Sequence, residues 1–178
     1  MKNSKILFFT DIHGSLFAMK KIKSIVDEVR PAKVVFLGDL LYHGPRNPLP
    51  EEYDPLGVVE LIENLGVPTV WVKGNCDAEV DETVMGRKAV SRYTVYSKGK
   101  KVICTHGDKL DKLDKKGAFA VVYGHFHVNA HTVSDGVNMV NISSVSLPKN
   151  GAKKAYGELS DGVLKVLDLD GNLLFEIE

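Results

Sequence analysis

Short apolar runs alternate with longer runs of helical spacing along the first half of the chain. Residues 5–10, 33–37 and 69–72 are apolar runs of strand length. Residues 15–30 repeat apolar side chains every three or four positions, which is the spacing of one helix face, and Pro31 ends that run. The pattern therefore predicts three strands, with a helix between the first two.

A loop over residues 41–54, which contains three prolines, leads into a second expected helix. Asp54 is followed by Pro55, as an N-cap is followed by proline at the first helical position, and Gly66 ends the apolar pattern. Three strands separated by two helices predict parallel βαβ units, because parallel neighbours need a crossover connection.

The second half of the chain predicts mostly strands. Residues 92–96 and 100–105 flank Lys98-Gly99 as the arms of a hairpin, and residues 118–123 read as another buried strand. Asp-Gly pairs, a strong hairpin signal, follow at Asp135-Gly136, Asp161-Gly162 and Asp170-Gly171. With no linker, repeat or low-complexity tract, we expect one α/β domain over residues 1–178.

Composition narrows the expected partners. Lys+Arg and Asp+Glu number 23 each, whereas a nucleic-acid binder usually carries a basic excess, so no large nucleic acid is expected. Cys76 and Cys104 are expected as free thiols in a reducing cytosol. No run approaches the ~20 apolar residues of a membrane span. The first apolar run is too short for a signal peptide, so a cytoplasmic protein without a membrane partner is expected.

Metal-ligand side chains lie beside glycines at the ends of five expected strands. In open α/β sheets, ligands bind at the carboxyl ends of the strands, so converging strand ends would gather these side chains into one site. The seven candidate ligands are Asp11, His13, Asp39, Asn75, His106, His125 and His127.

These ligand types suit two divalent metals. Carboxylates and imidazoles favour manganese, iron, zinc or nickel, and seven ligands are too many for one tetrahedral zinc. Asp39 is the candidate bridge, because it is one of only two carboxylates in the set. Two divalent cations, two carboxylates and a bridging hydroxide leave a charge of about +1 to meet an anionic phosphoryl group. The pattern therefore indicates phosphoester hydrolysis.

Longer motifs surround these ligands. They are Thr-Asp-Ile-His-Gly-Ser at 10–15, His-Gly-Pro-Arg-Asn at 43–47, Gly-Asn-Cys-Asp at 74–77 and Ser-Val-Ser-Leu-Pro-Lys at 144–149. Together with the histidine motifs, this order resembles the calcineurin-like metallophosphoesterase superfamily over nearly the whole chain. Within that superfamily, it is most similar to small bacterial phosphodiesterases of the YfcE type.

The resemblance implies a fold, a metal centre and a substrate class. The fold would be an αββα sandwich of two facing, mostly mixed β-sheets flanked by helices. Manganese would be the usual activating metal, with nickel, cobalt, zinc or iron as alternatives, and the substrate a small phosphodiester. A homodimer or higher homo-oligomer is also implied. One metal would be held by Asp11, His13, Asp39 and His127, and the other by Asp39, Asn75, His106 and His125.

The Gly-Asn-Cys-Asp turn supplies the candidate catalytic residues Asn75, Cys76 and Asp77. It departs from the family at Cys76, where many relatives have a histidine that protonates the leaving oxygen or orients the substrate. Because a thiol is a weak donor, we expect slow reaction of esters with poor leaving groups. Asp77 is expected to orient a ligand or the turn.

The 41–54 loop carries two candidate substrate contacts. Arg46 suits the bidentate geometry of a phosphate, or a salt bridge within the loop. His43 either reaches the metal edge or the phosphate, or caps the loop. Residues 41–54 and 107–117 are expected as the pocket walls. The residues expected in the core are Phe36, Trp71 and Cys104.

Two other functions compete with the phosphodiesterase hypothesis. A phosphomonoesterase acting on a small metabolite would use the same metals, and matched mono- and diesters would distinguish the two. The superfamily fold also serves as a non-catalytic scaffold in retromer. Such scaffolds tend to have eroded ligand sets, whereas this chain keeps all seven, which favours an enzyme.

Overall fold

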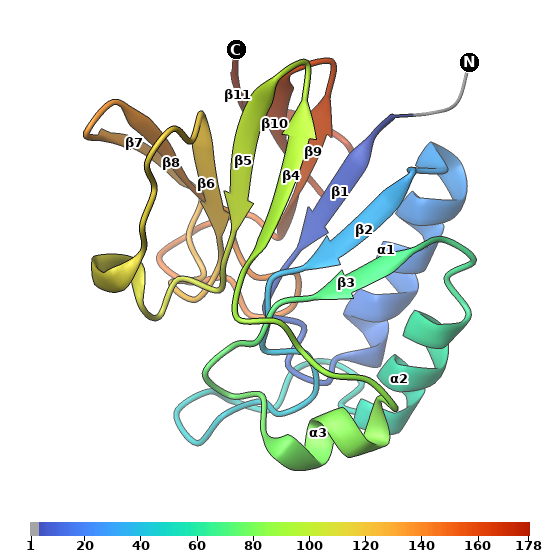
Figure 1. Ribbon diagram of the computed structural model, residues 1–178. Coiled ribbons are helices and arrows are strands. Elements are labelled where there is room, and N and C mark those ends of the chain that lie inside the picture. Colours follow the sequence, from blue (N-terminus) through green and yellow to red (C-terminus); the bar gives the residue numbers. More distant parts are fainter. Residues whose placement is uncertain (1–3) are drawn as a thin grey trace.

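The computed structural model describes residues 4–178, in which two β-sheets pack face to face (Figure 1). Helices cover the outer face of the first sheet, and the second sheet lies on the other side. The α/β class and the two facing mixed sheets expected from the sequence are confirmed. None of the helices in residues 4–178 combines the length and apolar character that a membrane span requires.

The first sheet has six strands in the order β11-β10-β9-β1-β2-β3. Its strands β1, β2 and β3 run parallel, as the alternating pattern predicts, and β9 pairs with β1 antiparallel. The carboxyl ends of the three parallel strands therefore lie at one end of the sheet. The bounds are β1 Ile6–Phe9, β2 Lys33–Phe36, β3 Thr69–Trp71, β9 Ala155–Ser160, β10 Val163–Asp168 and β11 Leu173–Ile177.

The second sheet has five strands in the order β4-β5-β6-β8-β7. Its central strands β5, β6 and β8 run parallel, while β4 and β7 pair antiparallel at the edges. The bounds are β4 Tyr93–Ser97, β5 Lys100–Cys104, β6 Ala120–Tyr123, β7 Ala130–Ser134 and β8 Val137–Asn141.

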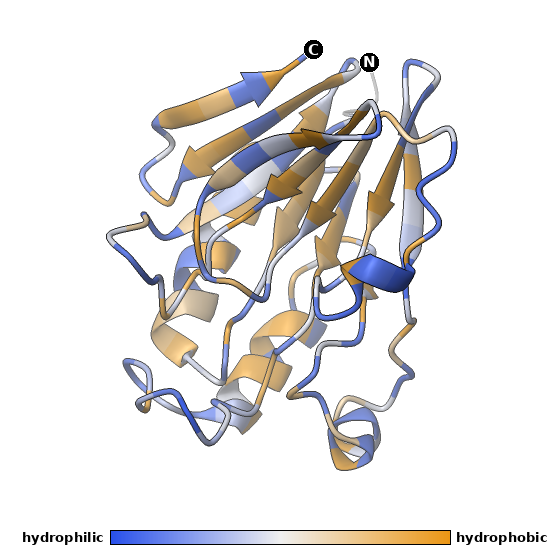
Figure 2. Ribbon diagram, turned by 90° about the vertical axis from the view of Figure 1, so that its left-hand side faces the viewer, coloured by the Kyte–Doolittle hydropathy of each residue, from blue (hydrophilic) through white to orange (hydrophobic). Residues whose placement is uncertain are grey.

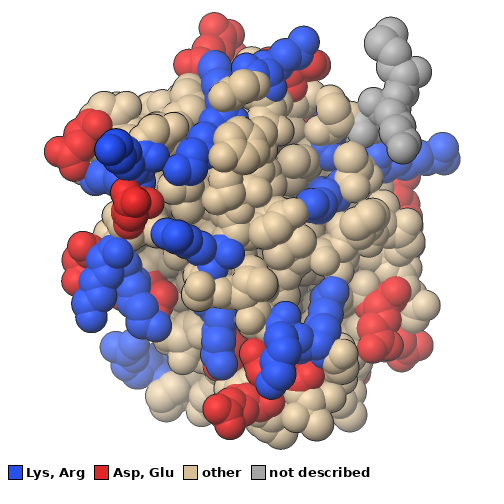
Figure 3. Space-filling view, in the orientation of Figure 1, with Lys and Arg blue, Asp and Glu red and all other residues tan. Residues whose placement is uncertain are grey.

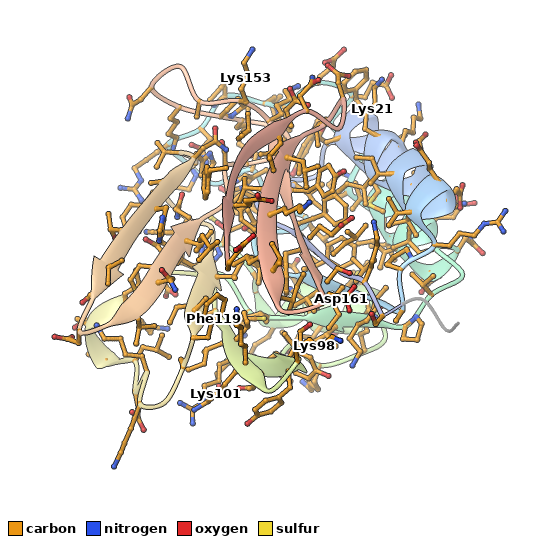
Figure 4. The ribbon with its side chains drawn as sticks, turned by 90° about the horizontal axis from the view of Figure 1, so that it is seen from above. Lys21, Lys98, Lys101, Phe119, Lys153 and Asp161 are labelled. Atoms are coloured by element: carbon orange, nitrogen blue, oxygen red, sulfur yellow. The ribbon has the colours of Figure 1, made fainter. Side chains whose placement is uncertain are left out.

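The hairpins predicted from Lys98-Gly99 and the Asp-Gly pairs are all present. Both residues of Lys98-Gly99, Asp135-Gly136 and Asp161-Gly162 have positive φ, which matches the twist of tight hairpin turns. Two of these turns meet at the end of the sandwich seen in Figure 4, where Lys98 Nζ lies 3.7 Å from Asp161 Oδ1. Gly162 N also donates to Ser97 Oγ at 2.9 Å, so one sheet is tied to the other there.

Two of the three α-helices were predicted, and the second begins at the predicted cap, Asp54. Helix α1, Leu16–Val29, starts after Ser15, whose hydroxyl accepts from Ala18 N, and helix α2, Pro55–Glu63, starts after Asp54. Helix α3, Glu79–Val84, was not predicted, because it has only six residues and no apolar repeat. Its first turn is held by Asp81, whose side chain accepts from Ala78 N at 2.8 Å.

Alternation along the central strands builds two cores. On β1, Leu7 and Phe9 face the helices, whereas Phe8 faces the second sheet. On β2, Phe36 faces the helices and Val35 the second sheet, in the same two-residue period. Because both faces of these strands are buried, they read in the sequence as continuous apolar runs.

The outer face of the second sheet carries little helix. Figure 2, which looks onto this face, shows mostly hydrophobic strands behind a short hydrophilic helical turn. That turn is the 3-10 helix η1, Leu110–Lys112, and Leu110 and Leu113 pack against Ile103, Val121 and neighbouring buried side chains. The segment 107–117 therefore covers the sheet from outside.

Candidate metal centre

The five strand ends that carry the candidate ligands meet at one end of the sandwich, at the bottom of Figure 1. Three strand ends, after β1, β2 and β3, belong to the first sheet, and two, after β5 and β6, belong to the second. The site thus lies between two sheets, whereas the strand-end pattern by itself suggested one sheet edge. Five of the seven side chains are buried, and Asn75 and His125 face the opening.

Asp11, His13 and His127 form a first cluster of donor atoms. Asp11 Oδ1 lies 3.3 Å from His127 Nε2 and 3.6 Å from His13 Nε2, and these two nitrogens are 3.2 Å apart. Donor atoms that share an ion at about 2.1 Å are about 3.0 Å apart in octahedral and about 3.4 Å apart in tetrahedral geometry. The observed spacings therefore fit one shared ion.

Asn75, His106 and His125 form a second cluster. His106 Nε2 lies 3.0 Å from Asn75 Oδ1 and 3.3 Å from His125 Nδ1. These spacings also match donors around one ion, and an amide oxygen with two imidazoles suits a borderline divalent metal.

Asp39 lies between the two clusters. Its Oδ2 is 3.4 Å from His106 Nε2 in the second cluster and 3.8 Å from His13 Nε2 in the first. Its other oxygen accepts from Cys76 N at 2.8 Å, which fixes the plane of the carboxylate. This position is the one that the bridging role expected from the sequence requires.

Backbone carbonyls orient three of the imidazoles. When Nδ1 donates to a carbonyl, the Nε2 lone pair is left facing the cluster, which is the form of neutral histidine that binds a metal. The three bonds join His13 Nδ1 to Tyr42 O (2.8 Å), His106 Nδ1 to Leu37 O (2.8 Å) and His127 Nδ1 to Leu147 O (2.5 Å).

The buried carboxylates of the two clusters fit bound cations. Asp11 and Asp39 are 0% and 3% exposed, and within residues 4–178 only histidines lie within ion-pair distance of them. Asp11 Oδ1 is buried without a hydrogen-bond partner. The other oxygen, Oδ2, accepts from Thr10 Oγ1 and His125 N, so Oδ1 is the atom of this carboxylate that lacks a partner. A divalent ion in each cluster would satisfy Asp11 Oδ1 and separate the facing imidazole lone pairs, so these residues fit two metals.

Backbone strain is concentrated at the same residues. A left-handed conformation costs a non-glycine residue on the order of 1 kcal/mol, and such outliers gather at functional sites. Outside the site, most described examples are helix caps or turn residues, such as Arg30 and Asp135. The candidate ligands with positive φ are Asp11 (55°), His13 (52°), Asp39 (55°), His125 (69°) and His127 (59°).

Two glycines make room for the carboxylates. A Cβ on Gly74 would overlap the Asp39 side chain, and a Cβ on Gly124 would overlap those of Asp11 and Thr10. In the Gly-Asn and Gly-His motifs, the second residue is therefore a candidate ligand, and the glycine leaves room for a carboxylate ligand from another strand end.

Asp77 holds the backbone that presents Asp39. Its Oδ2 accepts from Asp39 N at 2.9 Å, Gly74 N at 2.7 Å and Trp71 Nε1 at 3.1 Å, and its Oδ1 accepts from Leu40 N at 2.9 Å. Burial raises the pKa of Asp77, although the Gly74 and Leu40 N–H groups counter this. Trp71, expected in the core, is buried, and its indole N–H also positions this carboxylate.

Two serines hold Asp11 from the other side, a role that the sequence did not suggest. Ser144 Oγ and Ser146 Oγ both donate to Asp11 O, at 2.7 and 2.9 Å. The sequence signal for this role was the pair of serines on either side of Val145, in the Ser-Val-Ser-Leu-Pro-Lys motif. Because Asp11 has a strained backbone, these bonds help to keep its carboxylate pointed at the first cluster.

Cys76 reaches the edge of the site. Its sulfur forms a group with donor atoms of His13 and Asp39, all within 4.8 Å of one another. Burial and the nearby Asp39 carboxylate raise the pKa of the Cys76 thiol to about 12. Cys104 is fully buried, and both cysteines are free thiols as expected.

A cavity of about 690 Å³ opens over the donor atoms. Arg46 lines it, but His43 does not: the His43 ring packs edge-on against Tyr42 and Tyr53, with its Nδ1 buried and unpartnered. The expectation that residues 107–117 form a wall is wrong, because that segment covers the outside of the second sheet. The lining is completed by Asp39, Tyr42, Gly44, Pro45, Asn47, Asn75, Cys76, Ala78, His125, Phe126, His127 and Lys149.

The histidine clusters predict how metal-free protein responds to pH. Burial alone lowers the pKa of His106, but contact with Asp39 and the charge of Asp11 raise it to about 9. Asp11 likewise raises the pKa of His13 against its burial. A raised histidine pKa stabilises the fold fully below the unfolded value of about 6.5, and this stabilisation is lost as pH rises through the folded pKa.

We therefore expect the melting temperature of metal-free protein to fall between pH 6.5 and about 9. Thermal denaturation in chelator at several pH values measures this loss, on the order of 2–3 kcal/mol. Saturating manganese should remove the decline, because metal and protons compete for the same nitrogens. A pH profile unchanged by metal would contradict this interpretation.

Comparison with known proteins shows which protein family this sequence and this fold resemble. Residues 5–160 match the calcineurin-like phosphoesterase superfamily domain. Phosphodiesterase YfcE of Escherichia coli (strain K12) is 34% identical over 172 residues, which cover 93% of this chain and 92% of the relative. A solved structure of YfcE, a phosphoesterase from E. coli, has a TM-score of 0.89 and covers 97% of this chain and 98% of its own.

More distant structures share the fold. An archaeal phosphodiesterase is 20% identical with a TM-score of 0.62, covering 97% of this chain and 98% of its own. Vacuolar protein sorting 29 from Cryptosporidium parvum is 17% identical, with the same TM-score and 98% of each chain covered. At these identities the likeness shows the fold alone.

Proposed function

The chain belongs to the calcineurin-like phosphoesterase superfamily, and from that premise we propose that it hydrolyses phosphodiesters at a centre of two divalent metals. The observation that carries this proposal is the pair of donor clusters that share Asp39 beneath an open cavity. The 34% identity to a bacterial phosphodiesterase along almost the whole chain supports the diester preference.

When bound, two divalent ions would polarise phosphoryl oxygens and make a water-derived nucleophile available near neutral pH. The protein supplies the positioning. Asp39 sets the separation of the two donor clusters, and the side chains of Asp77 and Ser144 hold the backbone of the two carboxylate ligands, Asp39 and Asp11. Arg46 lines the cavity, where its guanidinium can pair with a phosphoryl oxygen.

Manganese is the proposed native metal. Oxygen and nitrogen donors, with no thiolate of low pKa, favour it or another hard or borderline ion over copper(I). Nickel, cobalt, zinc and iron suit the same donors, so relative activity with each metal in the assay below distinguishes them.

The proposal is tested with matched aryl phosphates. Purified protein with manganese is assayed on bis-(para-nitrophenyl) phosphate and on para-nitrophenyl phosphate, and kcat/KM is compared. The proposal predicts a higher kcat/KM for the diester than for the monoester. In the presence of chelator, neither ester should be hydrolysed. A higher value for the monoester would replace the proposal with the phosphomonoesterase alternative.

Cys76 limits the range of leaving groups. General acid catalysis is worth about 10²–10⁴-fold, and a thiol with a pKa of about 12 is a weak hydrogen-bond donor for a departing alkoxide. We expect Cys76→His to raise kcat/KM for a nucleoside ester, relative to an aryl ester, by about tenfold or more.

Measurement of both esters on wild type, Cys76→His and Cys76→Ala checks this expectation. The alanine variant controls for loss of the sulfur, and it should leave the ratio unchanged. If Cys76→His loses activity on every ester tried, the proposed limitation by Cys76 is wrong.

A further inference from the structure

The cavity over the donor atoms is much larger than a phosphoryl group. Its volume of about 690 Å³ lies within the ~300–1,000 Å³ range of sites that enclose whole organic ligands. Much of its lining comes from residues outside the two donor clusters, above all from the loop after Asp39 and from Phe126 and Lys149. These residues face the ester arms of a substrate.

Phe126 presents an aromatic ring to this cavity. It stands between the two candidate ligands of Gly-His-Phe-His and remains 50% exposed. Its ring packs edge-on against the His125 ring at a centroid distance of 5.0 Å. Because His125 and His127 both have left-handed backbones, the position of Phe126 is fixed by the same turn that presents the ligands.

Two cations line the same cavity. Within residues 4–178, neither the Arg46 guanidinium nor the Lys149 ammonium forms an ion pair. Lys149 N donates to His127 O at 2.9 Å, which places its backbone beside the turn of Phe126. On the face shown in Figure 3, basic and acidic side chains are interspersed.

A simple diester has one negative charge, which the positive charge of the metal centre already balances. Arg46 and Lys149 add two positive charges, and Phe126 adds a π-face on which a planar ring can stack. An exposed aromatic side chain beside unpaired cations is the combination that binds a base together with a phosphate.

We propose that Phe126, Arg46 and Lys149 form an ester-arm subsite that selects phosphodiesters in which one arm carries both a planar aromatic ring and a second anionic group, as nucleotidyl esters do. The inference rests on the phosphodiesterase function proposed above. It assigns the cavity wall a role in specificity that the metal ligands do not have.

Product-like probes test this subsite without turnover. Isothermal titration calorimetry on manganese-loaded protein compares inorganic phosphate, ribose phosphate, AMP and adenosine 3′,5′-bisphosphate. The subsite predicts that AMP binds about tenfold more tightly than ribose phosphate, from stacking. The bisphosphate should bind about tenfold more tightly than AMP, from the second charged contact.

Three variants assign these two gains in affinity to residues. Phe126→Leu keeps an apolar side chain but should abolish the gain of AMP over ribose phosphate, and Phe126→Trp should restore it. Lys149→Gln should abolish the gain of the bisphosphate over AMP. Tyr96→Leu and Lys98→Gln, on exposed residues outside the cavity, are matched controls and should leave the order unchanged.

The same preparations are assayed on bis-(para-nitrophenyl) phosphate. Protein that hydrolyses this diester but binds the four probes within twofold of one another overturns the subsite and leaves the proposed function intact. Equal weakening of all four probes in Phe126→Leu also overturns it, since the ring would then act only by supporting His125. Protein that hydrolyses no diester overturns both proposals.

Discussion

Asp39→Asn is expected to lower kcat/KM for a phosphodiester by about a thousandfold or more. The Asp39 Oδ2 atom lies near both donor clusters, 3.4 Å from His106 Nε2 and 3.8 Å from His13 Nε2. Metal-derived stabilisation of the transition state is worth several kcal/mol, and each 1.36 kcal/mol is tenfold in rate. An amide has the same shape but supplies no negative charge to hold two cations together.

Steady-state kinetics with manganese and metal analysis after gel filtration check this expectation. Asp39→Asn should retain at most one metal per chain under conditions in which wild type retains two. Asp27→Asn, an exposed change on α1, is the control and should match wild type in both assays. Substantial diesterase activity in Asp39→Asn would remove the bridging role.

Asp77→Ala is expected to destabilise the fold by about 3 kcal/mol or more, which corresponds to a fall in melting temperature of about 10 °C. One carboxylate accepts from the N–H groups of Asp39, Leu40, Gly74 and the Trp71 indole. Each buried donor left without a partner costs about 1–3 kcal/mol. The same change frees the backbone of Asp39, so metal affinity should also fall, by about 10–100-fold.

A graded series separates these contributions. Trp71→Phe removes one of the four donors and should have the smallest effect on metal affinity. Asp77→Asn keeps one oxygen but turns an amide donor toward another donor, so its effect should lie between those of Trp71→Phe and Asp77→Ala. Thermal denaturation with and without manganese measures the series. Equal stability of Asp77→Ala and wild type would show that these hydrogen bonds are not what holds the turn.

Much of the fold follows from local signals. Buried parallel strands read as continuous apolar runs, and Asp-Gly turns need positive φ, so β1 to β3 and the C-terminal hairpins were predictable. The six residues of α3 are too few for a period to emerge. The side of the second sheet on which residues 107–117 pack depends on Leu110 and Leu113 meeting a distant apolar face, which no local pattern encodes.

The candidate ligands were visible because each metal-binding residue type stands beside a glycine at a strand end. The residues that hold these ligands were less visible. Carbonyls such as Leu37 O carry no side-chain signal, and Ser144 reaches Asp11 across 133 positions of sequence. No sequence pattern singled out Phe126, whereas the structure shows it half exposed in the lining of the cavity.

The most direct test of the central claim is an anomalous-difference map from crystals of the protein grown with manganese. Two metals sharing Asp39 predict two peaks about 3.5–4 Å apart. One peak should contact Asp11, His13 and His127, and the other Asn75, His106 and His125, with Asp39 touching both. A single peak, or two peaks that do not share Asp39, would contradict a dinuclear centre in this chain.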